Sequence, residues 1–242
     1  MTSPLGSHVG SVAKLVVVLL LMLGFRSAAA ADLEYTDETI EGWTIRLAPS
    51  MLEAKHAEVL TKTRQMLGHA LFDIKQQLAS DRIKDLQTVV IVVEADNARL
   101  RAMQYHPSKE WLRANGHDVR LARCVHIPVA SHYINPRHHR TQPWCVMHEL
   151  AHAYHDQFLS FDHPEVIEVF KKARDAKLYE DVRFINGGTR KHYALTDHKE
   201  YFAELSESYL GTNDFFPFVR GELQSHDPAA YALLQKIWGK LE

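Results

Sequence analysis

The chain has 242 residues, of which 46% are hydrophobic and 24% are charged, without a low-complexity run or a repeat. This composition argues against a disordered chain and against a solenoid, and the length is enough to bury a sizeable core in one domain or in two small lobes around a shared cleft. The 28 basic and 30 acidic residues give a net charge of −2. Such a balance excludes the basic footprint expected of a nucleic-acid-binding protein.

Residues 1–31 differ from the rest of the chain in composition. Lys14 precedes the apolar run LVVVLLLMLGF, and small residues follow up to Ala31. This order is typical of a secretory signal peptide, and a run of about 11 residues is too short to cross a bilayer of about 30 Å. We expect cleavage near Ala31 and a mature domain, residues 32–242, that is secreted or periplasmic and does not associate with a membrane. An anchor that is not cleaved is the alternative.

In the mature chain, the predicted strands come first and most of the predicted helices follow. Strand-like alternation or β-branched runs occur at residues 42–47, 86–93 and 123–130. Helical apolar stripes or capping signals predict helices at 51–79, from Pro143 onward, and at 163–176, 197–210 and 228–241. Residues 103–116 look like loop and short helix. This order favours an α+β fold.

The only two cysteines are Cys124 and Cys145. In the oxidising compartment that export implies, they could close a loop that stabilises the fold by about 3 kcal/mol in the chain-entropy model. We therefore predict a disulfide between them. Two free buried thiols are one alternative. Metal ligation or nucleophilic chemistry at Cys145 is the other.

Residues 146–155 read VMHELAHAYH and carry the strongest functional signal. On a helix, His148 and His152 lie one above the other and can bind one ion, while Glu149 is turned about 100° away and can hold a water molecule. The apolar flanks would bury this helix, and buried histidines need polar partners that offset their desolvation. The pattern predicts a Zn²⁺ site with Glu149 as general base. A pair of histidines satisfied within the core is the alternative.

A catalytic zinc ion takes three protein ligands and leaves one position for water, so a third ligand must come from elsewhere. The metzincin pattern is excluded, because His155 and Phe158 occupy the positions of its glycine and third histidine. His155 shares roughly the face of His152 and is one alternative ligand. Residues 199–211, KEYFAELSESYLG, predict a helix with three further carboxylates, Glu200, Glu204 and Glu207. These could instead form a solvated acidic face.

HELAH at 148–152, followed by Tyr193, Thr196 and EYFAE at 200–204, resembles the catalytic domain of the anthrax lethal factor-like zinc metallopeptidases. In that family a tyrosine stands seven residues before the ligand glutamate, as Tyr193 stands before Glu200. The resemblance extends from Pro143 to Gly211. It implies a gluzincin-type zincin fold, with a strand-bearing N-terminal lobe, a helical C-terminal lobe and the zinc cleft between them.

The resemblance also implies a role for each matched position. It places zinc on His148, His152 and Glu200, with Glu149 as general base, Tyr193 as oxyanion stabiliser and Glu204 as a carboxylate that supports a ligand imidazole. Without the resemblance, we would interpret Tyr193 as a loop residue whose ring only packs against its neighbours. The resemblance further suggests that the strand at 123–130 pairs with an extended substrate.

We expect an exported zinc metallopeptidase whose partner is a peptide or protein substrate. The large accessory domains of the toxin have no counterpart in this chain, so the toxin's substrate is not carried over. The same residues could hydrolyse a non-peptide amide or ester. The alternative from another class is a non-catalytic binding module stabilised by zinc, although such a structural site needs four closed ligands and no base.

Overall fold

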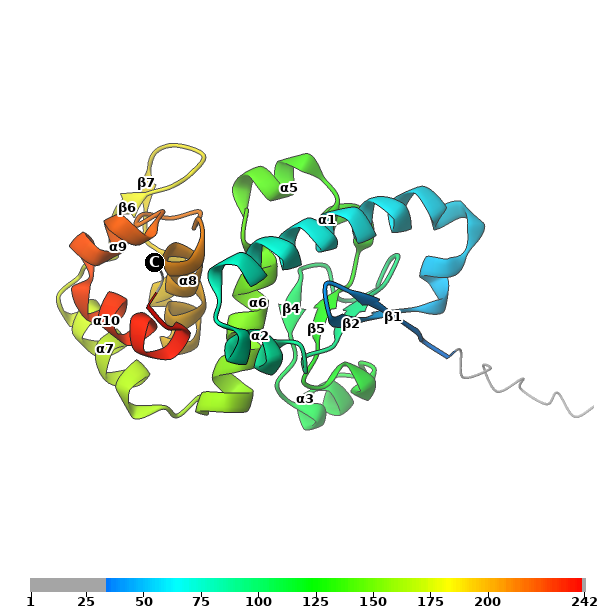
Figure 1. Cartoon of the computed structure of the whole chain (residues 1–242), viewed down its shortest axis with the longest axis horizontal. Coiled ribbons are helices and arrows are strands. Elements are labelled where there is room, and N and C mark those ends of the chain that lie inside the picture. Colours follow the sequence, from blue (N-terminus) through cyan, green and yellow to red (C-terminus); the bar gives the residue numbers. More distant parts are fainter. Residues whose placement is uncertain (1–33, 241–242) are drawn as a thin grey trace, which may run out of the picture. The chain divides into compact units, whose positions relative to one another are not determined.

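The computed structural model describes residues 34–240 (Figure 1), and the expected signal segment, residues 1–31, lies outside them. The described chain starts with an antiparallel hairpin of β1 (Thr36–Ile40) and β2 (Trp43–Leu47). Its turn residues Glu41 and Gly42 have positive φ values of 53° and 94°. Two such residues are what a tight hairpin turn requires. The strand predicted at 42–47 is confirmed, and β1 pairs with it.

The hairpin continues into a five-stranded mixed sheet with the order β1-β2-β3-β5-β4. β3 (Ile91–Val93) is parallel to β2 and to β5 (Val125–Ile127), and β4 (Gln104–Tyr105) is antiparallel to β5. The expectation that residues 123–130 pair with a substrate is wrong, because β5 has a strand on each side. The free edge beside β5 belongs to β4.

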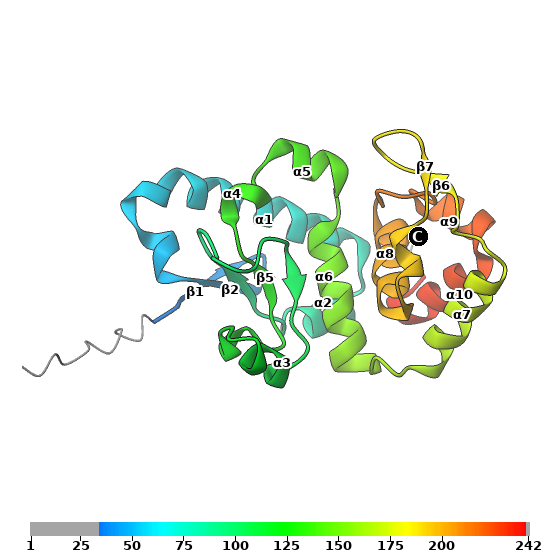
Figure 2. The same cartoon turned by 180° about the vertical axis from the view of Figure 1, so that it is seen from behind.

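Helices cover both faces of this sheet (Figure 2). On one face, α1 (Ala57–Gln77) and α6 (Cys145–Tyr154) pack over inward residues of the strands in the main core. On the other face, Leu112 of α3 (Lys109–Ala114) packs against Val92 in a second, smaller cluster. The alternation along β3 explains this division, since Ile91 and Val93 face the main core and Val92 faces the other way.

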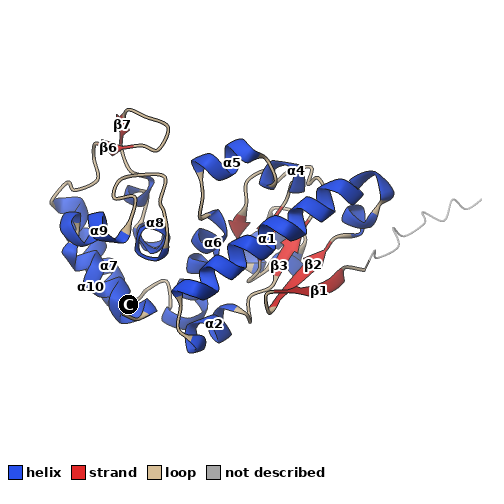
Figure 3. Cartoon of the chain, turned by 45° about the horizontal axis from the view of Figure 1, so that its top comes forward, coloured by secondary structure: helices blue, strands red, loops and turns tan. Residues whose placement is uncertain are grey.

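The C-terminal part of the chain is helical (Figure 3). α8 (His198–Leu210) packs against α6 and is surrounded by α7 (Pro164–Asp175), α9 (Arg220–His226) and α10 (Pro228–Trp238). All ten residues from 201 to 210 are buried, so α8 runs through the core. The helices predicted at 163–176 and 197–210 are confirmed. The helix predicted at 228–241 is confirmed from Pro228 but ends at Trp238, and Asp227 caps it by accepting a hydrogen bond from Ala230 N–H.

Shorter elements connect these parts. The remaining α-helices are α2 (Ser80–Leu86), α4 (Ala130–Tyr133) and α5 (Pro136–Thr141). A small hairpin pairs β6 (Val182–Arg183) with β7 (Thr189–Arg190). Single 3₁₀ turns occupy Pro49–Leu52, Ala54–His56, Val119–Leu121 and Tyr193–Leu195, and a π-helical turn, His155–Leu159, extends α6. The fold class is α+β, as predicted. Among residues 34–240, no helix combines the length and the apolar character needed to cross a membrane.

The predicted disulfide is wrong. Cys124 and Cys145 are both free and buried. They belong to separate core clusters, Cys124 under α3 and Cys145 at the start of α6, so the sheet architecture keeps the two thiols apart. Burial raises the pKa of the Cys145 thiol to about 12, which makes it a poor nucleophile.

Candidate metal centre

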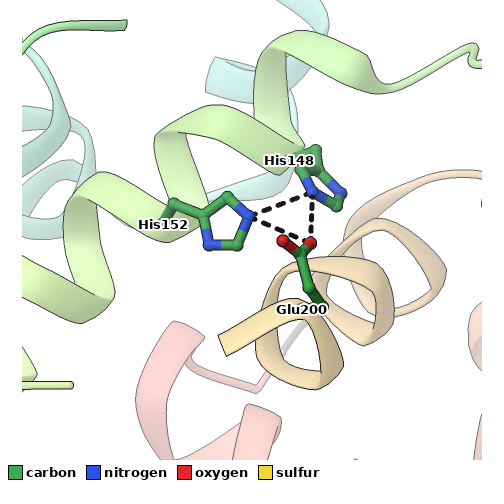
Figure 4. A group of neighbouring side chains, drawn as sticks. All are labelled: His148, His152 and Glu200. Atoms are coloured by element: carbon green, nitrogen blue, oxygen red, sulfur yellow. Dashed lines mark hydrogen bonds and ion pairs between the residues drawn. The ribbon is translucent and has the colours of Figure 1, made fainter. Parts of the chain in front are cut away.

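Two histidines of α6 and one glutamate of α8 converge on a single point (Figure 4). His148 and His152 are one helical turn apart, so their rings project from the same face of α6. Glu200 stands in the first turn of α8. The cap residue Asp197 accepts hydrogen bonds from the N–H groups of Lys199 and Glu200 and so determines where this helix begins. The cap therefore fixes the position of the Glu200 backbone opposite the two histidines.

The three converging atoms form a nearly equilateral triangle. The Nε2 atoms of His148 and His152 are 3.1 Å apart, and Glu200 Oε2 is 3.2 Å from each of them. Zinc bonds of about 2.0–2.1 Å in a tetrahedron place neighbouring ligand atoms about 3.3–3.4 Å apart. Two imidazole nitrogens that face each other this closely need a proton or a cation between them. Both the donor set and its spacing fit a zinc ion.

The electrostatics of the centre favour positive charge. Burial opposes a charge on His148, but hydrogen bonds with Glu200 and Glu207 outweigh it and raise the pKa of the imidazole well above its ordinary value. Burial also opposes ionisation of Glu200, yet hydrogen bonds from His148 and His152 lower the pKa of that carboxyl. In both cases the carboxylates attract a cation to the point where the rings meet. A metal ion would take the place of the proton there.

The other ring nitrogen of His148 faces a second group of carboxylates on α8. His148 Nδ1 lies 2.8 Å from Glu207 Oε1 and 3.6 Å from Glu204 Oε1. Glu207 is therefore the closer partner, although the resemblance pointed to Glu204. Glu204 is held instead by Asn213, whose amide Nδ2 donates to its Oε2 at 3.1 Å. The interpretation of these glutamates as a solvated acidic face is wrong, because Glu204 and Glu207 are each only 4% exposed.

Glu149 is buried beside the two histidines and is anchored to the sheet. Its Oε2 accepts a hydrogen bond of 2.7 Å from the backbone N–H of Tyr105 at the β4 edge. Burial raises the pKa of its carboxyl, although the histidines and the Tyr105 amide oppose this effect. A raised carboxyl pKa suits a group that must take up a proton near neutral pH. Nothing in the sequence pattern indicates this anchor, because it is made by a main-chain group.

Tyr193 stands on a 3₁₀ turn just before α8, and its side chain is 49% exposed. It lines the same cavity as His148, Glu149 and Glu200. Burial and the nearby charge of Glu200 raise the pKa of its phenol, so the hydroxyl keeps its proton. A protonated hydroxyl at the rim of the centre can donate a hydrogen bond to a bound ligand.

The centre opens into a cavity of about 630 Å³. The β4 edge forms one wall through residues 101–105, and α4 and α5 contribute His132, Tyr133 and His138. Glu204, Glu207 and Asp214 also line the cavity. Neither Asp214 nor the stretch of residues 131–140 was among the site residues predicted from the sequence. The histidine-rich composition of that stretch was the one signal that it could line a cleft.

His155 does not belong to the centre. Its ring is fully buried between Phe161 and Phe202, and neither ring nitrogen has a hydrogen-bond partner in the described residues. Burial lowers the pKa of this imidazole to about 3, so it is neutral. The alternative in which His155 supplies the third ligand is therefore not supported by its position.

Comparisons with family models, with curated proteins and with solved structures find no match to this chain.

Proposed function

We propose that this protein is a zinc-dependent metallopeptidase of the gluzincin kind, with a zincin-like arrangement of the sheet and helices around the metal. One observation carries the proposal. His148 Nε2, His152 Nε2 and Glu200 Oε2 meet at 3.1–3.2 Å, next to a buried glutamate and at the wall of a cavity of substrate size. Three ligands that face an open cavity are the arrangement of a catalytic zinc site, whereas structural sites are closed by four.

His148, His152 and Glu200 would hold the ion. When bound, zinc supplies a Lewis acid that lowers the pKa of a water molecule and polarises a carbonyl group. Glu149 is the proton acceptor for that water, because its buried carboxylate is fixed beside the ligands by the Tyr105 amide. The same glutamate, once protonated, can deliver the proton to the leaving amine.

Tyr193 and the sheet edge complete the site. The Tyr193 hydroxyl is in place to donate a hydrogen bond to the oxygen that becomes negative when the carbonyl is attacked. β4 forms the edge of the sheet along the cavity, so an extended peptide can lie beside it. A peptide substrate is favoured over a small amide or ester because the cavity runs along this edge for several residues.

The test combines zinc stoichiometry with cleavage of a denatured protein mixture. Wild-type protein should bind one zinc ion and cleave, and the chelated protein should not. Glu149→Gln should retain the zinc ion while the cleavage rate falls by about 10²- to 10⁴-fold. Zinc binding without any cleavage by the wild type would favour a zinc-stabilised binding module. Cleavage of esters or small amides alone would favour a hydrolase that acts on non-peptide substrates.

Export is part of the same proposal. The residues that suggest it precede Asp32 and lie outside the described chain. Intact-mass analysis of the protein recovered outside the cytoplasm should show an N-terminus near Ala31 or Asp32. Recovery of a chain that retains residues 1–30 would contradict cleavage.

A further inference from the structure

A group of buried carboxylates beside the metal centre is not used in the proposed mechanism. Glu204, Glu207 and Asp214 are 4%, 4% and 8% exposed, and all three line the cavity. Glu204 and Glu207 come from α8, and Asp214 follows that helix. Within residues 34–240, no lysine or arginine makes a close ion pair with any of them, and the only close basic partners are the imidazoles of His148 and His192.

Asp214 is the member of this group with the fewest partners. Its side chain makes no hydrogen bond or ion pair with another residue in the described chain, whereas Glu207 contacts His148 and Glu204 contacts Asn213. Burial and repulsion from Glu207 raise the pKa of its carboxyl to about 7. A buried carboxylate without a partner is costly, and a cation placed beside it would remove that cost.

A second, independent group in the cavity lining also lacks a partner. The Tyr133 side chain is 2% exposed and lines the cavity, and its hydroxyl has no hydrogen-bond partner in the described residues. Tyr133 and the three carboxylates line the same cavity. Buried hydroxyl groups are nearly always paired, so this one points to a polar ligand that enters the cavity.

We infer that the part of the cavity lined by Glu204, Glu207 and Asp214, with Tyr133 in the same lining, binds the side chain of a lysine or arginine next to the scissile bond. The inference rests on the proposed peptidase function and adds the substrate class. The carboxylates attract the cationic head group, and the Tyr133 hydroxyl oxygen can accept one of its hydrogen bonds.

Distance supports a residue that flanks the scissile bond. The carboxylate oxygens of Glu204 and Glu207 and a ring nitrogen of His148 all lie within 4.8 Å of one another. The opposite nitrogen of the same His148 ring faces Glu200 at the metal centre. The carboxylates of Glu204 and Glu207 are thus separated from the metal centre by little more than the imidazole ring of His148. A side chain of four or five atoms can span this distance.

The test measures both cleavage and binding with matched peptides. Peptides that carry lysine, arginine, norleucine or glutamate at each position flanking the scissile bond are offered to the zinc-loaded wild type. Their affinities are measured by calorimetry on Glu149→Gln, which should hold peptides without cutting them. We expect lysine or arginine at one flanking position to be favoured over norleucine by about 10- to 100-fold in kcat/KM and in affinity.

Asp214→Asn should reduce this preference by about tenfold while the zinc content is unchanged. Asp162→Asn is the matched control, because Asp162 is exposed, lies outside the cavity and undergoes the same loss of charge. Equal cleavage of basic and norleucine peptides, or an unchanged preference in Asp214→Asn, overturns the inference and leaves the peptidase proposal standing. Absence of any cleavage by the wild type overturns the peptidase proposal, and absence of a basic preference in binding then overturns the inference as well.

Discussion

Two roles for Tyr193 lead to opposite predictions. The resemblance implies that its hydroxyl stabilises an oxyanion, and the alternative is that its ring only packs. If its hydroxyl donates a hydrogen bond only to the developing oxyanion, Tyr193→Phe removes an interaction that the bound substrate hardly feels. We expect kcat to fall by about 10²- to 10³-fold with little change in KM. Steady-state kinetics on a peptide substrate measure this.

Zinc content and thermal stability serve as the controls for Tyr193→Phe. Both should stay near the wild-type values, because the ring is retained and nearly half of the side chain is exposed. A packing tyrosine would show the reverse, with Phe tolerated in catalysis. A kcat within about threefold of the wild type would remove Tyr193 from the mechanism.

Glu200, Glu204 and Glu207 should differ in their effect on zinc. Glu200→Ala removes a ligand, so most of the bound zinc should be lost. Glu207→Ala removes the carboxylate 2.8 Å from His148 Nδ1 and should weaken zinc affinity by about 10- to 100-fold. Glu204→Ala should have a smaller effect, since Glu204 lies 3.6 Å from that nitrogen.

A competition titration with a chromophoric chelator measures the three affinities. Circular dichroism of each zinc-free variant shows whether the fold is retained. A larger loss of affinity in Glu204→Ala than in Glu207→Ala would restore the assignment that the resemblance implied. Full zinc retention in Glu200→Ala would refute the ligand set.

The convergence of His148 and His152 could be predicted from the sequence because local geometry governs it, whereas Glu200 was assigned through the resemblance. The i, i+4 spacing of His148 and His152 places both rings on one face of any helix. Glu200, Glu204 and Glu207 also share a face, so spacing alone cannot say which of them meets His148. That choice depends on how α8 crosses α6, which is a tertiary property.

At the scale of elements, the start of α8 is a testable feature. Asp197 accepts hydrogen bonds from two N–H groups of the first turn, one of which belongs to the ligand Glu200. Asp197→Ala should lower the free energy of unfolding of the zinc-free protein by about 0.5–2 kcal/mol. Urea denaturation measures the change. Asp197→Asn keeps a capping oxygen, so its free energy of unfolding should fall clearly less than that of Asp197→Ala. Equal decreases in the two variants would show that the cap is not the cause.

Long helices were predictable from the sequence, because stripes such as the one at 163–176 span several turns and their periodicity is clear. β2, β3 and β5 lie within the ranges predicted for strands, but β3 and β5 have only three residues each and are shorter than predicted. β4 has only two residues and was not predicted, because so short a run gives little sequence signal and its pairing depends on the neighbouring strand. The edge position of β4 could not be predicted for the same reason.

At the scale of the whole molecule, the proposed zinc binding would be linked to folding through protons. In the zinc-free protein the raised pKa of His148 contributes stability that is complete below the unfolded-state pKa and is lost as the pH rises through the folded-state pKa. Zinc must displace this proton, so its affinity increases by about tenfold per pH unit for each proton released. The stability gained on binding zinc follows this affinity.

We therefore expect the gain in Tm on adding zinc to grow as the pH rises from about 6 to about 8. Thermal unfolding with and without zinc across this range measures it. Magnesium, which prefers oxygen ligands, is the control and should give little gain. A gain that is constant with pH would show that zinc displaces no proton.

The hydrogen bond from Tyr105 N–H to Glu149 has a consequence for solubility. An unpaired strand at a sheet edge is a template on which other chains can add strands and aggregate. β4 is such an edge, and the Glu149 carboxylate occupies one of its outward donors. The Glu149 carboxylate thus makes this one main-chain donor unavailable to an added strand. Replacement by glutamine keeps an acceptor for the amide, whereas replacement by alanine would leave a main-chain donor open to another chain.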